Sequence, residues 1–175
     1  MSNLKIYPEN DSTQLLFECT DGQEISAELE KMGIKFERWA VKDAEEGEPL
    51  EIYGDYIDSL KSAGGYQTAD VVQLKPDNPN KQELREKFLS EHTHSEDEVR
   101  FFVHGSGLFY LHLGEKVFAV TCMEGDLLSV PANTRHWFDM GPEPEFTCIR
   151  LFTDPAGWVA ELTGDPIADA FPLYE

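Results

Sequence analysis

The chain has 175 residues, of which 41% are hydrophobic and 11% are aromatic. A chain of this length buries roughly 70% of its extended surface on folding, so it supports one sizeable hydrophobic core. Because 14 basic residues stand against 34 acidic ones, the net charge is −20, and such a field repels nucleic-acid backbones and anionic lipid. We therefore expect a globular protein and exclude nucleic acid and membranes as partners.

The cysteines and the N-terminus indicate the expected cellular compartment of the protein. Cys19, Cys122 and Cys148 are too few and too scattered for a disulfide framework, and all three lie among apolar neighbours. The first ten residues lack the apolar stretch of a signal peptide, and no run approaches the ~18 apolar residues of a membrane helix. We expect reduced, buried thiols in a cytoplasmic protein.

The first 90 residues are predicted to mix strands and helices. Residues 21–33 combine an acidic first turn with a glycine stop, and the later helix opens with Asn78 as cap and Pro79 at its first position. We predict strands at 12–20 and 34–41 and helices at 21–33, 55–64 and 78–91.

From Glu98 onward, short strands alternate with turn residues. The predicted strands are 98–104, 107–113, 116–122, 126–131, 135–140 and 146–153. Closely spaced strands of this kind favour an antiparallel barrel or a double-sheet sandwich. No linker divides the chain, so we expect one domain, in which residues 1–90 pack on a barrel formed by 91–153. The tail, 154–175, is expected to hold a short helix or an irregular flap.

Three side chains near residue 95 have the spacing of metal ligands. His92 and His94 project from the same face only if the chain is extended, because two residues of helix turn by about 200°. Glu98 lies about 13 Å further along an extended chain, so residues 95–97 must bend to bring it back. Those three residues are Ser, Glu and Asp, which are good turn formers.

A fourth candidate, His136, follows a Pro-Ala-Asn turn that can aim its side chain back into the barrel. Three imidazoles and one carboxylate suit divalent ions such as Fe(II), Ni(II), Mn(II), Co(II) or Zn(II). Each motif alone is weak, because a single His before Trp and Phe is usually a satisfied core residue. The joint pattern is far more specific, and it predicts one divalent ion per chain.

Two motifs resemble those of the cupin superfamily. The first is H-x-H-x3-E-x6-G, from His92 to Gly105, and the second is G-x5-P-x-N-x2-H, from Gly125 to His136. Asn133 stands where the second motif usually has glycine, a mild change because Asn tolerates left-handed backbone geometry. The fold implied is an all-β double-stranded β-helix, a jelly-roll-like barrel, here with an N-terminal mixed α/β elaboration.

Within that superfamily, three segments are similar to the acireductone dioxygenase family of methionine salvage: EDEVRFFVHGSGLFYL, GDLLSVPANTRHWFDMG and IRLFTDPAGWVA. The resemblance implies that His92, His94, Glu98 and His136 bind Fe(II) or Ni(II). It also implies that O2 cleaves an enediol, acireductone (1,2-dihydroxy-3-keto-5-methylthiopentene). The products that the resemblance implies are formate and 4-methylthio-2-oxobutanoate with Fe(II), and formate, carbon monoxide and 3-methylthiopropanoate with Ni(II).

Five further residues are candidates for work on the substrate. Arg100 shares the strand face of Glu98 and is the natural cation for an enediolate, and Arg150 is a similar candidate by family comparison. For both, a buried ion pair with a carboxylate is the alternative. Asp97 is a candidate proton acceptor, or else an exposed turn residue. Phe138 and Trp158 are candidate walls for the methylthio tail, with plain core packing equally expected.

The two remaining histidines are left out of the site. His104 lies six residues past Glu98, about 20 Å along an extended strand, although its even number predicts the same face as Arg100 and Phe102. His112 lies on the next strand, whose register the turn at 105–107 does not fix.

Two other functions remain open at this point. One is a cupin that binds a metal and a small acid without chemistry, and the other is a metal-dependent isomerase that needs no O2. The high negative charge, with no obvious apolar patch, leads us to expect a monomer.

Overall fold

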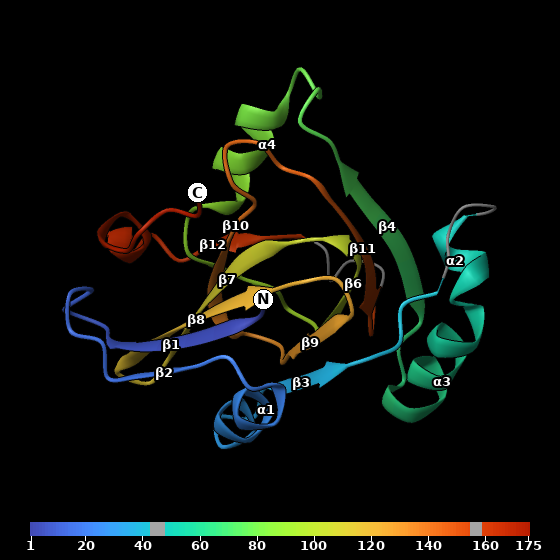
Figure 1. The fold of residues 1–175 in the computed structure, drawn as a ribbon, viewed down its shortest axis with the longest axis horizontal. Helices are drawn as coiled ribbons and strands as arrows, with labels where there is room; N and C mark the ends of the chain where they lie inside the picture. Colours follow the sequence, from blue (N-terminus) through green and yellow to red (C-terminus); the bar gives the residue numbers. More distant parts are fainter. Residues whose placement is uncertain (43–47, 155–158) are drawn as a thin grey trace.

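The computed structural model describes residues 1–42, 48–154 and 159–175, and it has two antiparallel sheets that wrap around a shared core (Figure 1). The core between them takes side chains from both sheets, including Phe109 and Phe118 from one and Phe102 and Phe146 from the other. This arrangement confirms the predicted all-β cupin barrel.

In the described part of the chain, the larger sheet has seven strands. In spatial order they are β12 (Glu161–Leu162), β5 (His92–Thr93), β10 (Arg135–Asp139), β7 (Gly107–Leu113), β8 (Lys116–Cys122), β1 (Asn3–Pro8) and β2 (Phe17–Cys19). The smaller sheet has five strands, in the order β3 (Lys35–Arg38), β9 (Asp126–Val130), β6 (Glu98–Gly105), β11 (Phe146–Phe152) and β4 (Thr68–Leu74). In each sheet, strands from the N-terminal half extend the barrel strands of the C-terminal half.

Alternation along β6 separates an inner face from an outer face. Phe102 packs in the central core, whereas Val99 and Phe101 pack with Tyr53 and Ile57 in a second cluster on the outside of the five-stranded sheet. Ile57 belongs to α3 (Gly54–Gly64), which lies beside β4 with α2 (Pro49–Ile52). Glu98 and Arg100 therefore face the barrel interior.

The other helices border the sheets. Asp21 caps α1 (Gly22–Glu30) by accepting from two backbone N–H groups of its first turn. α4 (Lys81–Phe88) lies above β10 in Figure 1, and the 3-10 helix η2 (Pro166–Ala170) lies on the opposite side of the barrel from α3. No helix in the described part of the chain is long and apolar enough to cross a membrane.

Some predicted bounds need correction. α4 begins at Lys81 with Asn80 as its cap, because Asn78 instead forms a turn in which its side chain accepts from the Asn80 N–H at 2.8 Å. The strand predicted at 12–20 is reduced to β2, and β1 and β4 were not predicted. The six strands predicted after Glu98 are all present, and the tail forms β12 and η2.

Candidate metal centre

The two cupin motifs meet at one point inside the barrel. His92 lies on β5 and pairs with His136 of β10, while His94 directly follows β5 and Glu98 opens β6. The three imidazole rings lie 4.5 to 5.2 Å apart between centroids, and one nitrogen from each lies within 4.8 Å of the others. All four side chains are buried, at most 4% exposed.

The loops that carry these side chains are bonded to each other. The Asn133 N–H donates to the His94 carbonyl at 2.8 Å, and the Ala132 N–H donates to Asp97 Oδ1 at 2.7 Å. Asn133 has a φ of 63°, which is the left-handed geometry expected of it. The bend at 95–97 and the turn before His136 are thus held in one fixed relation.

Backbone carbonyls fix the tautomer of each imidazole. Nδ1 of His92, His94 and His136 lies 2.8 to 3.0 Å from the carbonyls of Ser90, Val159 and Thr134, respectively. A carbonyl oxygen only accepts, so each Nδ1 carries the hydrogen and each neutral ring keeps its lone pair on Nε2. This is how proteins usually orient histidines that ligate metals.

Two buried acceptors face each other without a hydrogen bond. His94 Nε2 and Glu98 Oε2 lie 3.3 Å apart. They are the only buried side-chain nitrogen or oxygen atoms without a hydrogen-bond partner among the residues that the structure describes. Two apposed lone pairs at this distance require a cation or a shared proton. With two more imidazoles nearby, the donor set fits a divalent metal ion.

The protonation states suit metal binding. Burial raises the pKa of Glu98, but the charges of Arg100 and the histidines outweigh burial and lower that pKa to about 2. Burial, together with the neighbouring His92, lowers the pKa of His136 to about 3, and burial also lowers the pKa of His92. At neutral pH the site therefore offers an ionised Glu98 and neutral imidazoles at His92 and His136, the forms that ligate metals.

Arg100 lies against this centre. Its Nε donates to Glu98 Oε1, which leaves Oε2 for the space between the imidazoles. Its guanidinium lies over the rings of Phe109 and Phe138, at 5.3 and 5.6 Å from their centroids. Phe138 is buried and packs on Phe109 with centroids 4.6 Å apart. Arg100 is thus both a partner of Glu98 and a cation inside the barrel.

The remaining candidates lie further out. Arg150 is half-buried and forms a two-point ion pair with Asp70 of β4, at 2.9 and 2.6 Å. A pair with a carboxylate is the alternative to a role on the substrate. Asp97 is exposed and accepts a hydrogen bond from the Ala132 N–H, as expected of a turn residue. Trp158 lies outside the described residues.

The predicted facing of His104 is wrong. A register shift in the pairing of β6 with β11, between Thr147 and Cys148, breaks the alternation beyond Phe102. The His104 side chain is 57% exposed and lies 3.5 Å from both Glu124 and Glu145. It is therefore outside the centre, as expected from its distance along the strand.

Sequence reasoning missed a polar group on the back of the centre. Glu91, directly before His92, contacts His112, whose strand register the sequence does not fix. Glu91 and His112 are both buried. The only signal in the sequence is that Glu91 directly precedes the candidate ligand His92. His112 lies 21 residues further along the chain, and only the pairing of β7 with β10 brings it close.

Known proteins are similar to this chain in sequence and in fold. The ARD/ARD′ family profile matches residues 3–160. The acireductone dioxygenases of Hahella chejuensis and Aquifex aeolicus are 56% and 52% identical over 179 and 180 residues, covering 100% of this chain and 97% of each relative. A solved acireductone dioxygenase from Bacillus anthracis, with a cadmium ion in its active centre, superposes with a TM-score of 0.78 at 29% identity, covering 91% of this chain and 97% of that one. The chain therefore belongs to the acireductone dioxygenase family.

Proposed function

We propose that this protein cleaves acireductone with O2, using one divalent ion, Fe(II) or Ni(II), bound by His92, His94, Glu98 and His136. The observation that carries the proposal is the apposition of His94 Nε2 and Glu98 Oε2, two buried acceptors 3.3 Å apart without a hydrogen-bond partner. Family membership adds the reaction, because the relatives at 56% and 52% identity are acireductone dioxygenases over the full chain.

The donor set fits first-row divalent ions. Three neutral imidazoles and one carboxylate are typical ligands of Fe(II) and Ni(II), and four protein ligands leave room for a substrate that chelates. When bound, such an ion supplies Lewis-acid and redox chemistry at the enediolate. The cadmium ion of the Bacillus anthracis enzyme lies in its active centre, which supports one metal site at the same place in this chain.

Side chains of the chain itself would bind and orient the substrate. Arg100 is buried beside Glu98 and carries the positive charge that an enediolate needs. The Phe138 ring lies against that guanidinium and offers an apolar wall for the methylthio group. Asp97 and Arg150 remain candidates at the edge of the centre. Trp158, which lies outside the described residues, remains a candidate from its sequence alone.

The test is oxygen consumption with synthetic acireductone. Protein loaded with Fe(II) or Ni(II) should consume O2, protein treated with a chelator should not, and His94→Ala should stay inactive after reloading. A non-catalytic cupin would bind the enediol without O2 uptake, and an isomerase would convert a substrate under anaerobic conditions. Either result in place of O2 uptake would refute the proposed reaction.

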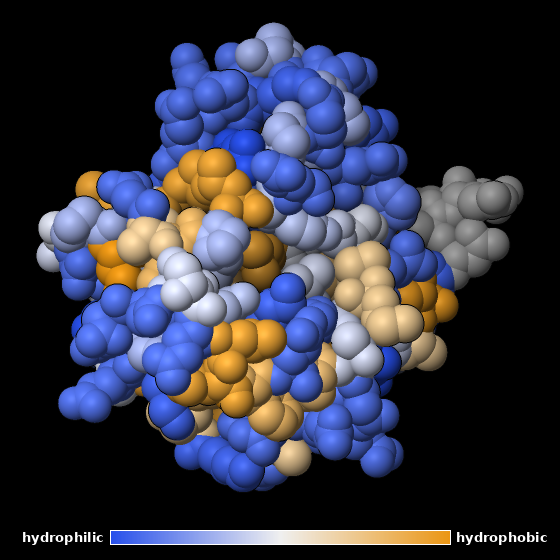
Figure 2. Space-filling model, turned by 60° about the vertical axis from the view of Figure 1, so that its left-hand side comes forward, coloured by the Kyte–Doolittle hydropathy of each residue, from blue (hydrophilic) through white to orange (hydrophobic). Residues whose placement is uncertain are grey.

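We further propose that residues 1–175 act as a single domain, in a monomeric cytoplasmic protein. Strands from the N-terminal half belong to the same two sheets as the barrel strands, which supports one domain. On the face seen in Figure 2, hydrophobic residues form patches separated by hydrophilic ones. This pattern and the net charge of −20 favour a monomer. Light scattering of the purified protein measures the oligomeric state.

A further inference from the structure

His92 lies on a strand that has little backbone pairing with its neighbours. β5 has two residues, His92 and Thr93. It pairs with β10 through His92 and His136, and with β12 through two residues of that equally short strand. The Ser90 carbonyl orients the His92 ring, but because few backbone bonds hold β5, other contacts are needed to hold the backbone that carries the ring.

Those contacts come from Glu91, on the opposite face of the same sheet. Its carboxylate lies 2.6 Å from His112 Nδ1 and accepts from the Thr163 hydroxyl at 2.8 Å. Its carbonyl accepts from the Thr163 N–H at 3.1 Å. Glu91 is 1% exposed. The residue before His92 is thus tied to β7 and to the segment after β12.

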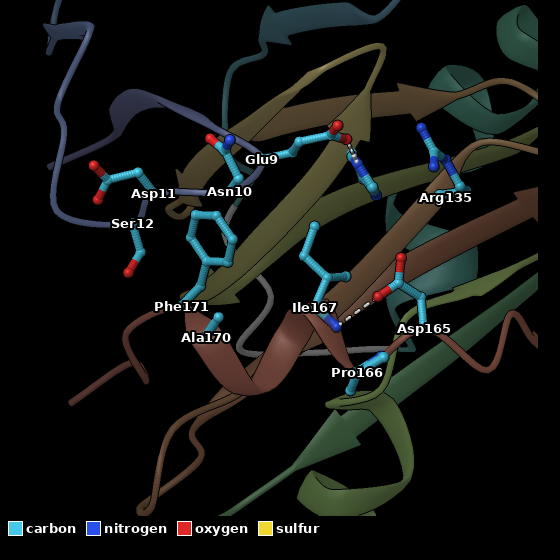
Figure 3. Close-up of a pocket in the computed structure, with 11 residues that line it drawn as sticks. Glu9, Asn10, Asp11, Ser12, Arg135, Asp165, Pro166, Ile167, Ala170 and Phe171 are labelled. Atoms are coloured by element: carbon cyan, nitrogen blue, oxygen red, sulfur yellow. Dashed lines mark hydrogen bonds and ion pairs between the residues drawn. The ribbon is translucent and has the colours of Figure 1, made fainter.

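His112 lies on β7 one residue along from the position opposite His136, on the other face of the sheet. On β7 it pairs with Arg135, and its neighbour Leu111 pairs with His136. Its Nε2 lies 2.7 Å from the Glu9 carboxylate. Both residues line a pocket of about 590 Å³, in which Figure 3 labels Glu9. One buried imidazole therefore links the end of β1 to the residue before His92, across the back of β10.

We propose that Glu91 and His112 are positioning residues, which hold the His92 ring in the geometry that binds the metal. This inference rests on the proposed function, because it takes His92 as a ligand. Partners behind a metal ligand reduce the freedom of its ring, and losing them typically weakens metal binding by about 10- to 100-fold. Here the link acts through one peptide unit, so we expect the low end of that range.

The same residues could instead bind a second ion. Donor atoms of Glu91, His112 and Asp165 lie within 4.8 Å of one another. However, Glu91 and His112 already satisfy each other, and neither has a buried atom without a partner. Their 2.6 Å contact is a hydrogen-bond distance, whereas ligands about 2.1 Å from a zinc ion lie more than about 3 Å apart. The observations therefore favour positioning.

The experiment measures metal affinity separately from stability. Metal-free wild type and His112→Gln are titrated with Ni²⁺ against a competing chelator, and their Co²⁺ absorption spectra are recorded. The matched control is Asp126→Asn. Asp126 is 1% exposed and bonded to Ser2 and Arg38, at the end of β9 away from Val130, the residue that pairs with Glu98.

We expect His112→Gln to bind Ni²⁺ about tenfold more weakly, with a changed Co²⁺ spectrum. Asp126→Asn should lower the melting temperature but leave both metal readouts unchanged. Glu91→Gln should retain most of the affinity that Glu91→Ala loses, because an amide oxygen still accepts from His112 Nδ1–H. If His112→Gln does not fold, Glu9→Gln takes its place in the same two metal measurements, because the Glu9 side chain is 40% exposed.

Three outcomes would overturn the inference. Unchanged Ni²⁺ affinity and Co²⁺ spectra in the His112 and Glu91 variants would leave the pair a structural contact only. A second equivalent of Zn²⁺ that disappears in His112→Gln would make the cluster a metal site. His92→Ala distinguishes a failure of the proposed ligand set from a failure of the positioning role. If His92→Ala keeps Ni²⁺, the ligand set is wrong. If His92→Ala loses Ni²⁺ while His112→Gln does not, only the positioning role fails.

Discussion

His94 Nε2 and Glu98 Oε2 face each other at 3.3 Å in the interior of the barrel, and neither forms a hydrogen bond. Each has its other side occupied: His94 Nδ1 bonds to the Val159 carbonyl and Glu98 Oε1 to Arg100. Leaving such a pair unsatisfied costs about 1–3 kcal/mol per group, and more where one group is charged. A cation between them removes that cost, so metal binding should also stabilise the fold.

The first prediction concerns metal retention. His92→Ala, His94→Ala, Glu98→Ala and His136→Ala should each lose most of their metal on desalting, whereas wild type keeps about one ion. His104→Ala is the control, because that side chain is exposed and lies among surface carboxylates. Bound metal is measured by elemental analysis. Full occupancy in the Glu98 and His136 variants would contradict the assignment.

The second prediction concerns Arg100. Arg100→Ala should lower kcat/KM about ten- to a hundredfold, the cost of one charge-assisted contact of roughly 1.5–3 kcal/mol. The variant should still hold its metal at saturating Ni²⁺, because the ion then supplies the positive charge beside Glu98. Steady-state O2 uptake and metal analysis are the measurements. If Arg100→Ala loses its metal while Arg100→Lys is fully active, the role of Arg100 is only to hold the Glu98 carboxylate in place.

The third prediction concerns the cysteines. Cys19, Cys122 and Cys148 are buried, and burial raises the pKa of Cys148 to about 12 and that of Cys122 well above its usual value. Since the thiolate is the reactive form, none should react with iodoacetamide at pH 8 in the folded protein. All three should react in guanidinium chloride, as mass spectrometry would show. Labelling of Cys122 or Cys148 without unfolding would contradict their placement.

The fourth prediction concerns the contact between α4 and β10. Arg85 forms a two-point pair with buried Asp139, at 2.7 and 3.1 Å, and donates to the Tyr174 carbonyl at 3.2 Å. Arg85→Met should cost about 3 kcal/mol, the low end for breaking a buried pair, because Asp139 keeps backbone donors from Gly141 and Tyr174.

Urea unfolding is the measurement, with an unchanged m-value as the sign that only stability has changed. Lys81→Met is the matched control on the same helix. Its pair with Glu143, at 2.7 Å, has side chains 31% and 67% exposed, so losing it should cost at most about 1 kcal/mol. Equal losses in both variants would show that Arg85 acts by surface charge alone.

Much of the fold could be predicted because the C-terminal half carries its signals locally. Every turn between the strands from Glu98 to Phe152 contains Gly, Pro or Asn, and each predicted strand is present. β1 and β4 pair with barrel strands that come much later in the chain, so their place in the sheets depends on contacts that the local sequence does not carry. α4 begins late because the Asn78 side chain forms a local turn that competes with the helix start.

The site was predictable to the extent that it depends on local spacing. His92 and His94 share a side of an extended segment, and the bend at 95–97 returns Glu98, as expected. The Glu91–His112 contact and the Arg150–Asp70 pair depend on which strands are neighbours. The facing of His104 depends on a register shift in the pairing with β11. The spacing of residues within one segment carries no information on which strands are neighbours or on register shifts between them.

The last prediction concerns the products. The donor set of three imidazoles and one carboxylate accepts either ion, and by the general divalent order Ni(II) should bind more tightly than Fe(II). The purified protein should therefore carry whichever metal its growth medium supplied. Stripped and reloaded separately, both forms should consume O2 with acireductone, but only the nickel form should release carbon monoxide. Headspace gas analysis, with mass spectrometry of the acids, separates the two. Identical products from both forms would remove the dependence on the metal, and no O2 uptake in either would leave a binding protein.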